Sequence, residues 1–523
     1  MSLYITTPLY YVNDTPHIGH AYTTIIADVL RRYRRMYGEE TLFLTGTDEH
    51  GQKVQTAALK RGLTPQAHCD EMVVNFQNIW KELGIDYDIF YRTTAPTHVK
   101  AVQICLQDLF DRDEIYTKEF TGWYSVSDEI FYTEKDLVGG KAPTGSEVSL
   151  VTEKNYFFKM SKYQDQLIAH IEANPGFIAP ESKRNEVLGF LKKPLQDLCI
   201  SRPKARMSWG IEMPFDKDYV TYVWFDALLN YAVGVGFKVP GEGAKFEKWW
   251  NPSSCGATHL MGKDILTTHA VYWTTMLMGL RAPLPKQIFA HGWWLTESNE
   301  KMSKSKGATI KPLDMKNLVG VDGLRYFLTR DIHLGNDAQF SQDLVIARVN
   351  TDLANNFGNL LSRSTNLIEK FFSGEIPKIE LQLPASLELA KHAESLVEKV
   401  KHEVFGMAPN RAIEAVTDLL SAANKFMEDQ APWKSLKAAA GDTAKMRDGA
   451  ESLIVSLECL RFAGILLSPV MPSKMNELLS QIGWSNKPAI EDLKKFRMIK
   501  ESTRIAKATP LFPRVEIKPA LNS

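Results

Sequence analysis

The chain has 523 residues, too many for one hydrophobic core, so about two to four domains are expected. Hydrophobic residues make up 44% and charged residues 24% of the sequence, which excludes a disordered, collagen-like or coiled-coil chain. Lysine plus arginine equals aspartate plus glutamate at 62 each, so no field of the whole molecule attracts a polyanion, and any contact with nucleic acid must rest on local patches.

The N-terminal residues predict a β-α-β unit. An apolar strand covers residues 4–7, a polar loop residues 13–19, a helix residues 21–37 and a second strand residues 41–45. Gly38 supplies a C-terminal stop for the helix. The helix carries apolar side chains at three- and four-residue steps, namely Tyr22, Ile25, Ile26, Val29, Tyr33 and Met36. The loop therefore leads into a helix N-terminus.

This loop ends in Pro16-His17-Ile18-Gly19-His20. A helix N-terminus gathers unpaired N–H groups and the positive end of the helix dipole, so it stabilises a bound anion such as a triphosphate. Gly19 lets the backbone approach a ligand closely, and the two imidazoles supply further donors. A pair of capping or core histidines is equally compatible with this motif alone.

A stretch rich in aromatic residues, glycine and proline separates two α/β segments. Residues 119–212 contain short alternating runs at 122–132 and 156–160, which is typical of an inserted domain. The α/β pattern resumes with a β-rich run at residues 219–224 and an apolar-periodic segment at residues 267–279.

A basic loop follows the second α/β segment. Its sequence is Lys301-Met302-Ser303-Lys304-Ser305-Lys306-Gly307. The ammonium groups can neutralise charge that develops on a leaving pyrophosphate, which lowers the energy of a transition state. Taken alone, the run is more typical of a solvated surface. Its occurrence downstream of the histidine loop favours the catalytic interpretation.

Residues after about 345 predict helices. A second strongly apolar run covers residues 453–467, and an apolar stripe at helical spacing consists of Ile413, Val416, Leu419, Leu420, Ala423 and Phe426. We therefore predict an α/β protein whose Rossmann-type parallel sheet is split by an insertion and followed by an all-α helical bundle. The expected domains are residues 1–118 and 213–295 for the two sheet halves, 119–212 for the connective insertion, 296–345 for the lysine-loop region and 346–523 for the bundle.

The histidine and lysine loops, in this order and at this separation, resemble the two signatures of the class I aminoacyl-tRNA synthetases. The resemblance implies that the sheet halves form a catalytic domain, that the lysine-loop region contacts the tRNA stem and that the bundle binds the anticodon. It implies ATP, with Mg²⁺, as a substrate. The implied catalytic residues are His17, His20, Lys301 and Lys304, and Gly19 and Ser303 are implied as further ATP-binding residues.

Several segments resemble the methionyl-tRNA synthetases specifically. Residues 7–11, 45–51 and 222–227 each end a predicted strand, where open α/β sheets bind ligands. Residues 228–230 depart from the usual pattern of the family. Aromatic walls suit a thioether, because sulfur contacts ring edges favourably. The resemblance implies a methionine side-chain pocket of Leu9, Tyr11, Trp224, Ala227, Tyr231, His269 and Trp273, with Asp48 as partner of the substrate ammonium and with Gly262 and Asp264 on the nucleotide side.

The insertion lacks the cysteine pairs that hold zinc in many members of this family. The five cysteines are widely spaced at Cys69, Cys105, Cys199, Cys255 and Cys459, and residues 122–129 occupy the place of the expected pair. A tetrahedral zinc site without thiolate pairs has no ligands. We therefore expect no metal and a zinc-free insertion held by aromatic packing.

In the helical region, residues 352–363 and 428–433 resemble the anticodon-reading segments of the family. Asn359, Arg363 and Trp433 are the implied readers of tRNA(Met), and single-stranded bases do stack on aromatic faces. Solvated helix positions and a tryptophan that staples a helix start are the alternatives. A basic stretch at Lys494, Lys495, Arg497, Lys500, Arg504 and Lys507 fits either tRNA phosphate contact or an ordinary surface.

Two rival functions remain compatible with parts of the sequence: a small-molecule nucleotidyltransferase, and an inactive tRNA-binding relative. A β-like run directly after the first residues leaves no room for a leader, and apolar stretches fall short of the roughly 18 residues that span a membrane. The wide spacing of the cysteines favours a cytoplasmic location. The chain stops soon after the helices, without the extra C-terminal RNA-binding module that makes some relatives dimeric. We therefore expect a monomer that uses L-methionine, ATP and tRNA(Met) and has no membrane partner.

Overall fold

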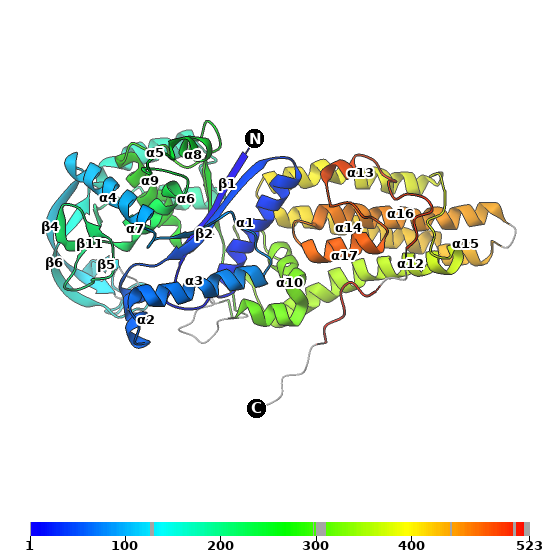
Figure 1. Cartoon of the computed structure of the whole chain (residues 1–523), viewed down its shortest axis with the longest axis horizontal. Helices are drawn as coiled ribbons and strands as arrows, with labels where there is room; N and C mark the ends of the chain where they lie inside the picture. Colours follow the sequence, from blue (N-terminus) through cyan, green and yellow to red (C-terminus); the bar gives the residue numbers. More distant parts are fainter. Residues whose placement is uncertain are drawn as a thin grey trace, which may run out of the picture. The chain divides into compact units, whose positions relative to one another are not determined.

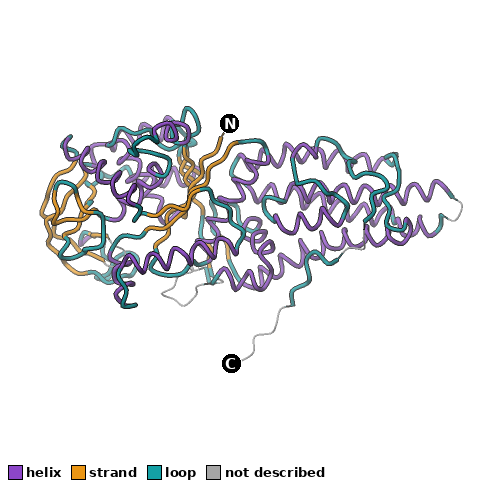
Figure 2. Tube along the Cα trace, viewed as in Figure 1, coloured by secondary structure: helices purple, strands orange, loops and turns teal. Residues whose placement is uncertain are grey.

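The computed structural model describes residues 2–125, 130–296, 298–299, 310–439, 442–505 and 509–516. They form two compact units. The first comprises Met1–Pro16, Glu40–Lys81 and Ile85–Gly292, and the second comprises His17–Glu39, Glu82–Gly84 and Trp293–Ser523. Figure 2 shows nearly all strands in the first unit and mainly helices in the second. This agrees with the predicted α/β fold and C-terminal helical region.

A six-stranded sheet forms the centre of the first unit. All its adjacent strands pair in parallel, in the order β3-β2-β1-β12-β13-β7. The strands are β1 (Ser2–Tyr11), β2 (Glu40–Asp48), β3 (Ile89–Arg92), β7 (Ile178–Ala179), β12 (Ala257–Gly262) and β13 (Gln287–His291). Because the strand order reverses direction between β1 and β12, the ligand-binding edge is expected at the carboxyl ends of these two strands.

Strand pairing stops early at this point of reversal. The ladder between β1 and β12 ends at Thr6 and His259. By contrast, β1 stays paired with β2 as far as Tyr11 and Asp48, and β12 stays paired with β13 as far as Gly262. The last residues of β1 and β12 are therefore not paired with each other, as expected where two strands diverge at a point of reversal.

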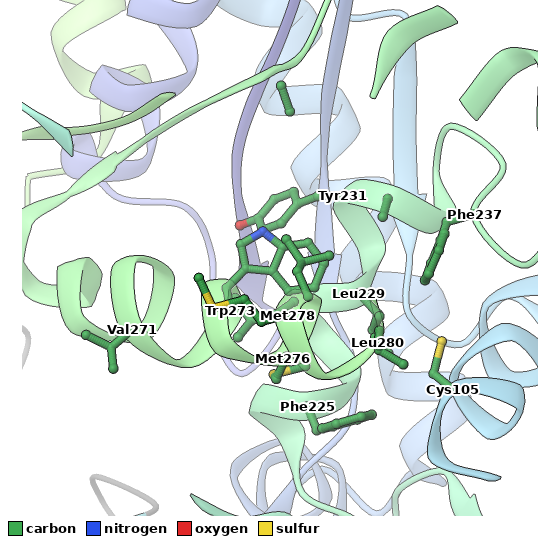
Figure 3. Packing of buried hydrophobic residues seen from close by; sticks show 14 of the residues in the cluster. Cys105, Phe225, Leu229, Tyr231, Phe237, Val271, Trp273, Met276, Met278 and Leu280 are labelled. Carbon is green, nitrogen blue, oxygen red and sulfur yellow. The ribbon is translucent and has the colours of Figure 1, made fainter. Parts of the chain in front are cut away.

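Helices and their apolar faces surround the sheet. A large buried cluster includes Phe225, Leu229 and Tyr231 of α7 and Met276 of α9, and Figure 3 shows their side chains packed together. The helical segments of this unit are α2 (Gln52–Lys60), α3 (Pro65–Glu82), α4 (Pro96–Asp111), α5 (Gln164–Ala173), α6 (Glu181–Phe190), α7 (Val223–Val233), α8 (Gly243–Trp249) and α9 (Thr274–Gly279), with 3-10 turns Glu134–Asp136, Met160–Tyr163 and Lys263–Ile265 and a π-helix Thr268–Trp273.

The predicted insertion contains an antiparallel sheet ordered β5-β4-β6-β8. Its strands are β4 (Ile115–Ser125), β5 (Ile130–Tyr132), β6 (Ser149–Phe158) and β8 (Leu198–Cys199). Strand β7, also within residues 119–212, instead pairs with β13 of the parallel sheet. The predicted alternating runs at 122–132 and 156–160 overlap β4, β5 and β6, whereas β7, which extends the main sheet, lies outside both runs.

The β-rich run at residues 219–224 is not a strand of the parallel sheet, contrary to expectation. Strand β11 (Asp216–Thr221) pairs antiparallel with β9 (Ser201–Pro203) and β10 (Glu212–Met213). Helix α7 then begins at Val223, so Trp224 and Ala227 lie on a helix. The run of aromatic and β-branched residues has strand propensity, but the strand ends at Thr221 and Tyr222, whose backbone is extended, is the N-cap of the helix.

The second unit is built mainly from helices. The helices α13, α14 and α16 run alongside one another in Figure 1. The predicted stripe on α14 is buried at every position. The elements of this unit are α1 (Ile18–Met36), β14 (Trp294–Leu295), α10 (Pro312–Arg330), β15 (Ala338–Gln339), α11 (Gln342–Arg348), a π-helix (Val349–Phe357), α12 (Gly358–Phe372), α13 (Pro384–Phe405), α14 (Pro409–Gln430), α15 (Pro432–Lys437), α16 (Thr443–Leu467), α17 (Pro472–Gln481) and a 3-10 turn Ile490–Leu493.

Candidate functional site

The predicted methionine pocket contains a buried hydrogen-bonded pair, Tyr231 and His269. Nε2 of His269 lies 2.8 Å from the Tyr231 hydroxyl, and Nδ1 lies 2.9 Å from the carbonyl oxygen of Ile265. A carbonyl only accepts, so Nδ1 carries the hydrogen and Nε2 accepts from the tyrosine. Burial lowers the pKa of His269 to about 4, which keeps the ring neutral at physiological pH. The pocket wall at this point is therefore uncharged, as an apolar side chain requires.

A second buried histidine, which the sequence interpretation missed, supports the same wall. Nε2 of His259 accepts from the indole N–H of Trp273 at 3.1 Å, and Nδ1 lies 2.8 Å from the Thr6 hydroxyl. Burial lowers the pKa of His259 well below its ordinary value. The His259 ring also lies 4.4 Å from the Tyr231 ring. A histidine in the middle of the apolar strand β12 was the available signal.

The remaining pocket residues lie at the carboxyl ends of β1 and β2 and on α7. Tyr11 is the strand partner of Asp48, and its ring meets Trp224 edge to face at 6.5 Å. Asp48 is buried, with 2% of its surface exposed. Ala227 lies on the same helix as Trp224. Leu9, two residues before Tyr11, is half-buried against the same core. The structure thus places Asp48 and Tyr11 in register at the ends of β2 and β1 with Trp224 against Tyr11, and it groups Tyr231 and Trp273 around His259.

The predicted nucleotide-side residues follow β12 at this same edge. Gly262 ends the strand and Asp264 lies in the 3-10 turn that follows. A Cβ on residue 262 would lie 2.5 Å from Oδ1 of Asp264, so glycine makes room for the carboxylate. The neighbouring strand ends at His291, whose pKa is lowered by burial.

The histidine motif spans the start of helix α1, with Pro16 and His17 before the helix and Ile18, Gly19 and His20 in its first turn. Helix α1 begins at Ile18, and His17 is its cap, with Nδ1 accepting from the N–H of Gly19 at 3.1 Å. Nδ1 of His20 lies 3.4 Å from the backbone N–H of His17, and the two rings stack at 3.7 Å. This reciprocal capping starts the helix three residues earlier than predicted.

This capping changes the expected chemistry of the motif. The N–H groups of Ile18 and Gly19 are both occupied, since Ile18 donates to the carbonyl of Ile310 at 3.1 Å. The imidazoles and the helix dipole are then the groups that a phosphate would meet. A Cβ on residue 19 would lie 3.0 Å from the His17 ring, so glycine is needed here to let that ring cap the helix.

The predicted lysine loop, with Lys301, Ser303 and Lys304, lies outside the described residues. Ile310, the third residue after Gly307, accepts a hydrogen bond from the N–H of Ile18 at the start of α1. Figure 1 likewise places α1 and α10, which follows the loop, beside each other.

Two of the three predicted anticodon readers contact each other. The Arg363 guanidinium lies 5.0 Å from the centre of the Trp433 ring and 3.4 Å from a carboxylate oxygen of Glu428. Asn359 lies one turn before Arg363 on α12 and is exposed. Trp433 is half-buried at the second position of α15, next to the buried Pro432.

The described part of the basic C-terminal stretch is anchored through its backbone. Glu458 of α16 accepts from the N–H groups of Met498 and Ile499 at 2.7 Å each, and Arg461 donates to the carbonyl of Lys495 at 3.0 Å. The buried pair Glu458 and Arg461 is joined at 2.7 Å. This leaves Lys494, Lys495, Lys500 and Arg504 exposed, while Lys507 lies outside the described residues.

The described residues contain neither a cluster of metal ligands nor a membrane-spanning helix. Within the ranges given above, no group of three or more histidine, cysteine, aspartate or glutamate side chains is placed to hold a metal ion. Residues 126–129, within the expected zinc-free knuckle, are outside these ranges, so the absence of zinc stays a prediction. No helix among the described residues is both long and apolar enough to cross a membrane.

Comparison with known proteins gives a consistent result. The family described as tRNA synthetases class I (M) matches residues 3–148 and 141–365. The methionine–tRNA ligase of Caldanaerobacter subterraneus subsp. tengcongensis is 42% identical over 523 residues, which cover 100% of this chain and 80% of that protein. The ligase of Clostridium perfringens is 42% identical over 520 residues, 99% of this chain and 79% of that protein.

A solved structure extends the likeness to three dimensions. The methionyl-tRNA synthetase of Mycobacterium tuberculosis in complex with methionyl-adenylate matches with a TM-score of 0.91 and 38% identity, covering 98% of this chain and 100% of that one. Together with the full-length relatives and the family match, this shows that the chain belongs to the methionyl-tRNA synthetases, the class I tRNA synthetases for methionine.

Proposed function

We propose that the chain performs the reaction of its family, methionine–tRNA ligation, at the carboxyl edge of the parallel sheet. The observation that carries this proposal is that Asp48 lies with Tyr11 and Trp224, and that its carboxylate is close enough to the neutral Tyr231–His269 pair to act electrostatically on Tyr231. A carboxylate next to an uncharged aromatic pocket matches an amino acid with an ammonium group and an apolar side chain.

The side chain of methionine would lie among the aromatic residues. Tyr231 and Trp273 are almost fully buried, and their rings are 6.1 Å apart. A thioether contacts ring edges favourably, by about 0.3–1.5 kcal/mol per contact. His269 and His259 each have both ring nitrogens hydrogen-bonded within the protein. Their polar atoms are thereby satisfied without the substrate, and the rings present apolar surface to it.

Asp48 would pair with the substrate ammonium. This side chain ends β2, and Tyr11 is its partner on β1. A buried carboxylate is costly unless a positive group joins it, so ammonium binding in place of water is favoured. This pairing leaves the substrate carboxylate to react with ATP.

For activation, the methionine carboxylate oxygen attacks the α-phosphorus of ATP, a new P–O bond forms and the bond to pyrophosphate breaks. His17 and His20 would bind the phosphates, with Gly19 making room for the His17 ring. Lys301, Ser303 and Lys304 would stabilise the leaving pyrophosphate, which is supported by the bond between Ile18 and Ile310 beside that loop. Gly262 and Asp264 would contact the nucleoside. Mg²⁺ would enter with ATP as part of that substrate.

For transfer, a hydroxyl of the 3'-terminal ribose of tRNA(Met) attacks the carbonyl carbon of methionyl-adenylate, and AMP leaves. Anticodon bases would stack on Trp433 and receive hydrogen bonds from Asn359 and Arg363. The ion pair of Arg363 with Glu428 is solvent-exposed and therefore weak, about 0–1 kcal/mol. Releasing Arg363 to a base thus costs little.

The domain roles stay part of this proposal. Residues 1–118 and 213–295 would form the catalytic domain, 119–212 the connective insertion, 296–345 the stem-contact region and 346–523 the anticodon-binding domain. We further propose a cytoplasmic monomer.

Pyrophosphate exchange into ATP, measured across the twenty amino acids, tests the function directly. We expect exchange with methionine at a rate that no other amino acid approaches. Exchange supported only by a substrate that is not an amino acid would instead indicate a small-molecule nucleotidyltransferase. Tight tRNA binding without any turnover would indicate an inactive relative.

A further inference from the structure

Asp226 is a buried carboxylate in the first turn of α7 that the proposed reaction does not use. None of its surface is exposed. Its Oδ2 atom lies 2.6 Å from Nδ1 of His50, and its Oδ1 atom lies 2.9 Å from Nε2 of His98. We call these three residues the Asp226 cluster. Each carboxylate oxygen is therefore occupied by an imidazole nitrogen, and neither is available to a ligand.

The cluster is a consistent donor and acceptor chain. Burial raises the pKa of Asp226, but the charges and hydrogen bonds of His50 and His98 outweigh burial and lower it below its ordinary value. Nδ1 of His98 lies 3.1 Å from the hydroxyl of Tyr91. When the His98 ring is neutral and Nε2 donates to the carboxylate, its Nδ1 accepts from Tyr91. An ionised carboxylate held in this way resists displacement, since losing one partner leaves a buried charge unpaired.

The cluster joins two segments that carry different parts of the methionine site. His50 follows Asp48 by two residues at the end of β2, and Asp226 stands between Trp224 and Ala227 on α7. The 2.6 Å contact between His50 and Asp226 thus connects the end of β2, which carries the proposed ammonium partner, to α7, which carries part of the proposed side-chain wall.

Trp209 holds the same loop from the other side. Its indole N–H donates to the carbonyl of Glu49 at 2.5 Å, and its carbonyl accepts from Gly51 at 3.1 Å. Its ring lies 5.4 Å from the His50 ring. The segment from Asp48 to Gly51 is therefore held both by α7, through Asp226, and by Trp209, which precedes α7 in the sequence.

We propose that the Asp226 cluster positions the methionine site by setting the separation between Asp48 and the pocket wall on α7. The inference rests on the proposed function of that site. The ammonium group and the side chain of an amino acid are attached to the same carbon atom. The protein groups that bind them must therefore be held at a fixed distance from each other. The proposed ATP-binding residues lie on neither β2 nor α7. Loosening the cluster should consequently weaken the use of methionine and leave ATP binding intact.

Pyrophosphate exchange at varied methionine and at varied ATP tests this in the full chain. In Asp226→Asn, the side-chain NH2 group faces one of the two imidazole donors, so one hydrogen bond of the cluster is lost. We expect kcat/KM for methionine to fall at least tenfold, while the KM for ATP stays within twofold. His50→Ala should do the same. His50→Asn, which retains an N–H donor near the position of Nδ1, should recover kcat/KM to within about threefold of the unaltered chain.

A structural role alone predicts a different pattern. The active fraction, titrated as a burst of adenylate, would then fall with both KM values unchanged, and this result would overturn the inference. Equal losses for His50→Ala and His50→Asn would overturn it as well. If Asp226→Asn does not fold, the His50 pair decides. Asp322→Asn, which changes a buried carboxylate in the other unit, is the matched control and should leave the methionine KM unaltered.

The unaltered chain separates this inference from the proposed function. Methionine-dependent exchange by that chain, together with normal methionine use by Asp226→Asn and His50→Ala, would refute the positioning role alone. No methionine-dependent exchange by the unaltered chain would refute the proposed function and the inference with it.

Discussion

The guanidinium of Arg363 lies over the ring of Trp433, 5.0 Å from its centre, although the two residues belong to different helices, α12 and α15. The contact joins a cationic donor and an aromatic face at one surface. Such a pair is suited to an unstacked base, which needs a platform and edge-directed hydrogen bonds.

Trp433→Ala should therefore impair tRNA charging without impairing amino-acid activation. Loss of a stacking platform costs about 1–3 kcal/mol per base, so we expect kcat/KM for tRNA to fall about 10- to 100-fold. Aminoacylation and pyrophosphate exchange are measured on the same preparation. Trp433→Phe keeps an aromatic face and serves as the control. Equal loss of both activities would show that Trp433 serves only to start α15.

Lys304→Ala should slow adenylate formation and leave methionine affinity largely intact. The proposed contact is made to charge that develops on the leaving pyrophosphate, and removing one such donor commonly costs about 10²–10³ in kcat. Single-turnover adenylate formation gives the rate, and its dependence on methionine gives the affinity. The exposed Lys311, close in sequence and outside the motif, is the control site. An unchanged rate for Lys304→Ala would contradict the proposed role.

Tyr231→Phe should weaken methionine use while ATP use stays normal. The substitution leaves Nε2 of His269 without its 2.8 Å donor in a buried wall. An unsatisfied buried acceptor costs about 1–3 kcal/mol, and we expect an increase of about tenfold in the methionine KM. Exchange kinetics with each substrate varied in turn provide the measurement. If water replaces the hydroxyl without effect, the KM will stay at its original value and the pair is not needed for binding.

Stability should fall as the pH drops from about 6.5 to 4, partly because of His259 and His269. Burial lowers the pKa of both rings, of His269 to about 4. In this window the unfolded chain binds protons that the folded chain does not, so unfolding becomes easier by about 1.4 kcal/mol per pH unit for each histidine. Above pH 6.5 this contribution is fully present.

Urea denaturation at several pH values measures this dependence. His259→Gln should reduce the slope between pH 4 and 6.5, whereas the exposed His402→Gln should not. The same slope in both variants would mean that His259 titrates as it does in the unfolded chain.

The purified chain should contain no zinc. Its five cysteines all lie in the described part of the chain, and none of them is in a disulfide. Elemental analysis after dialysis, with protein concentration measured independently, gives the stoichiometry. About one zinc per chain would refute the prediction. A lower melting temperature after treatment with a chelator would then identify the ion as structural.

Short-range patterns made much of this protein predictable. The apolar stripe on α14 is helical and buried as expected, because apolar residues three or four positions apart lie on one face of a helix. The histidine and lysine motifs indicated a class of synthetase, since their residue types match what phosphate chemistry needs. The run at residues 219–224 was predicted correctly as a strand only as far as Thr221, because the helix start at Val223 overrides strand propensity in the rest.

The sequence by itself thus determined the fold class, the family and most of the residues at the proposed site. Only the tertiary structure decided how they support each other. The link between His50 and Asp226 joins residues 176 positions apart, and that between Trp273 and His259 sets a tautomer. Such contacts depend on which strands pair and where each helix begins. Spacing along the chain records the period of one element, whereas the partner of a buried charge is chosen by packing between elements.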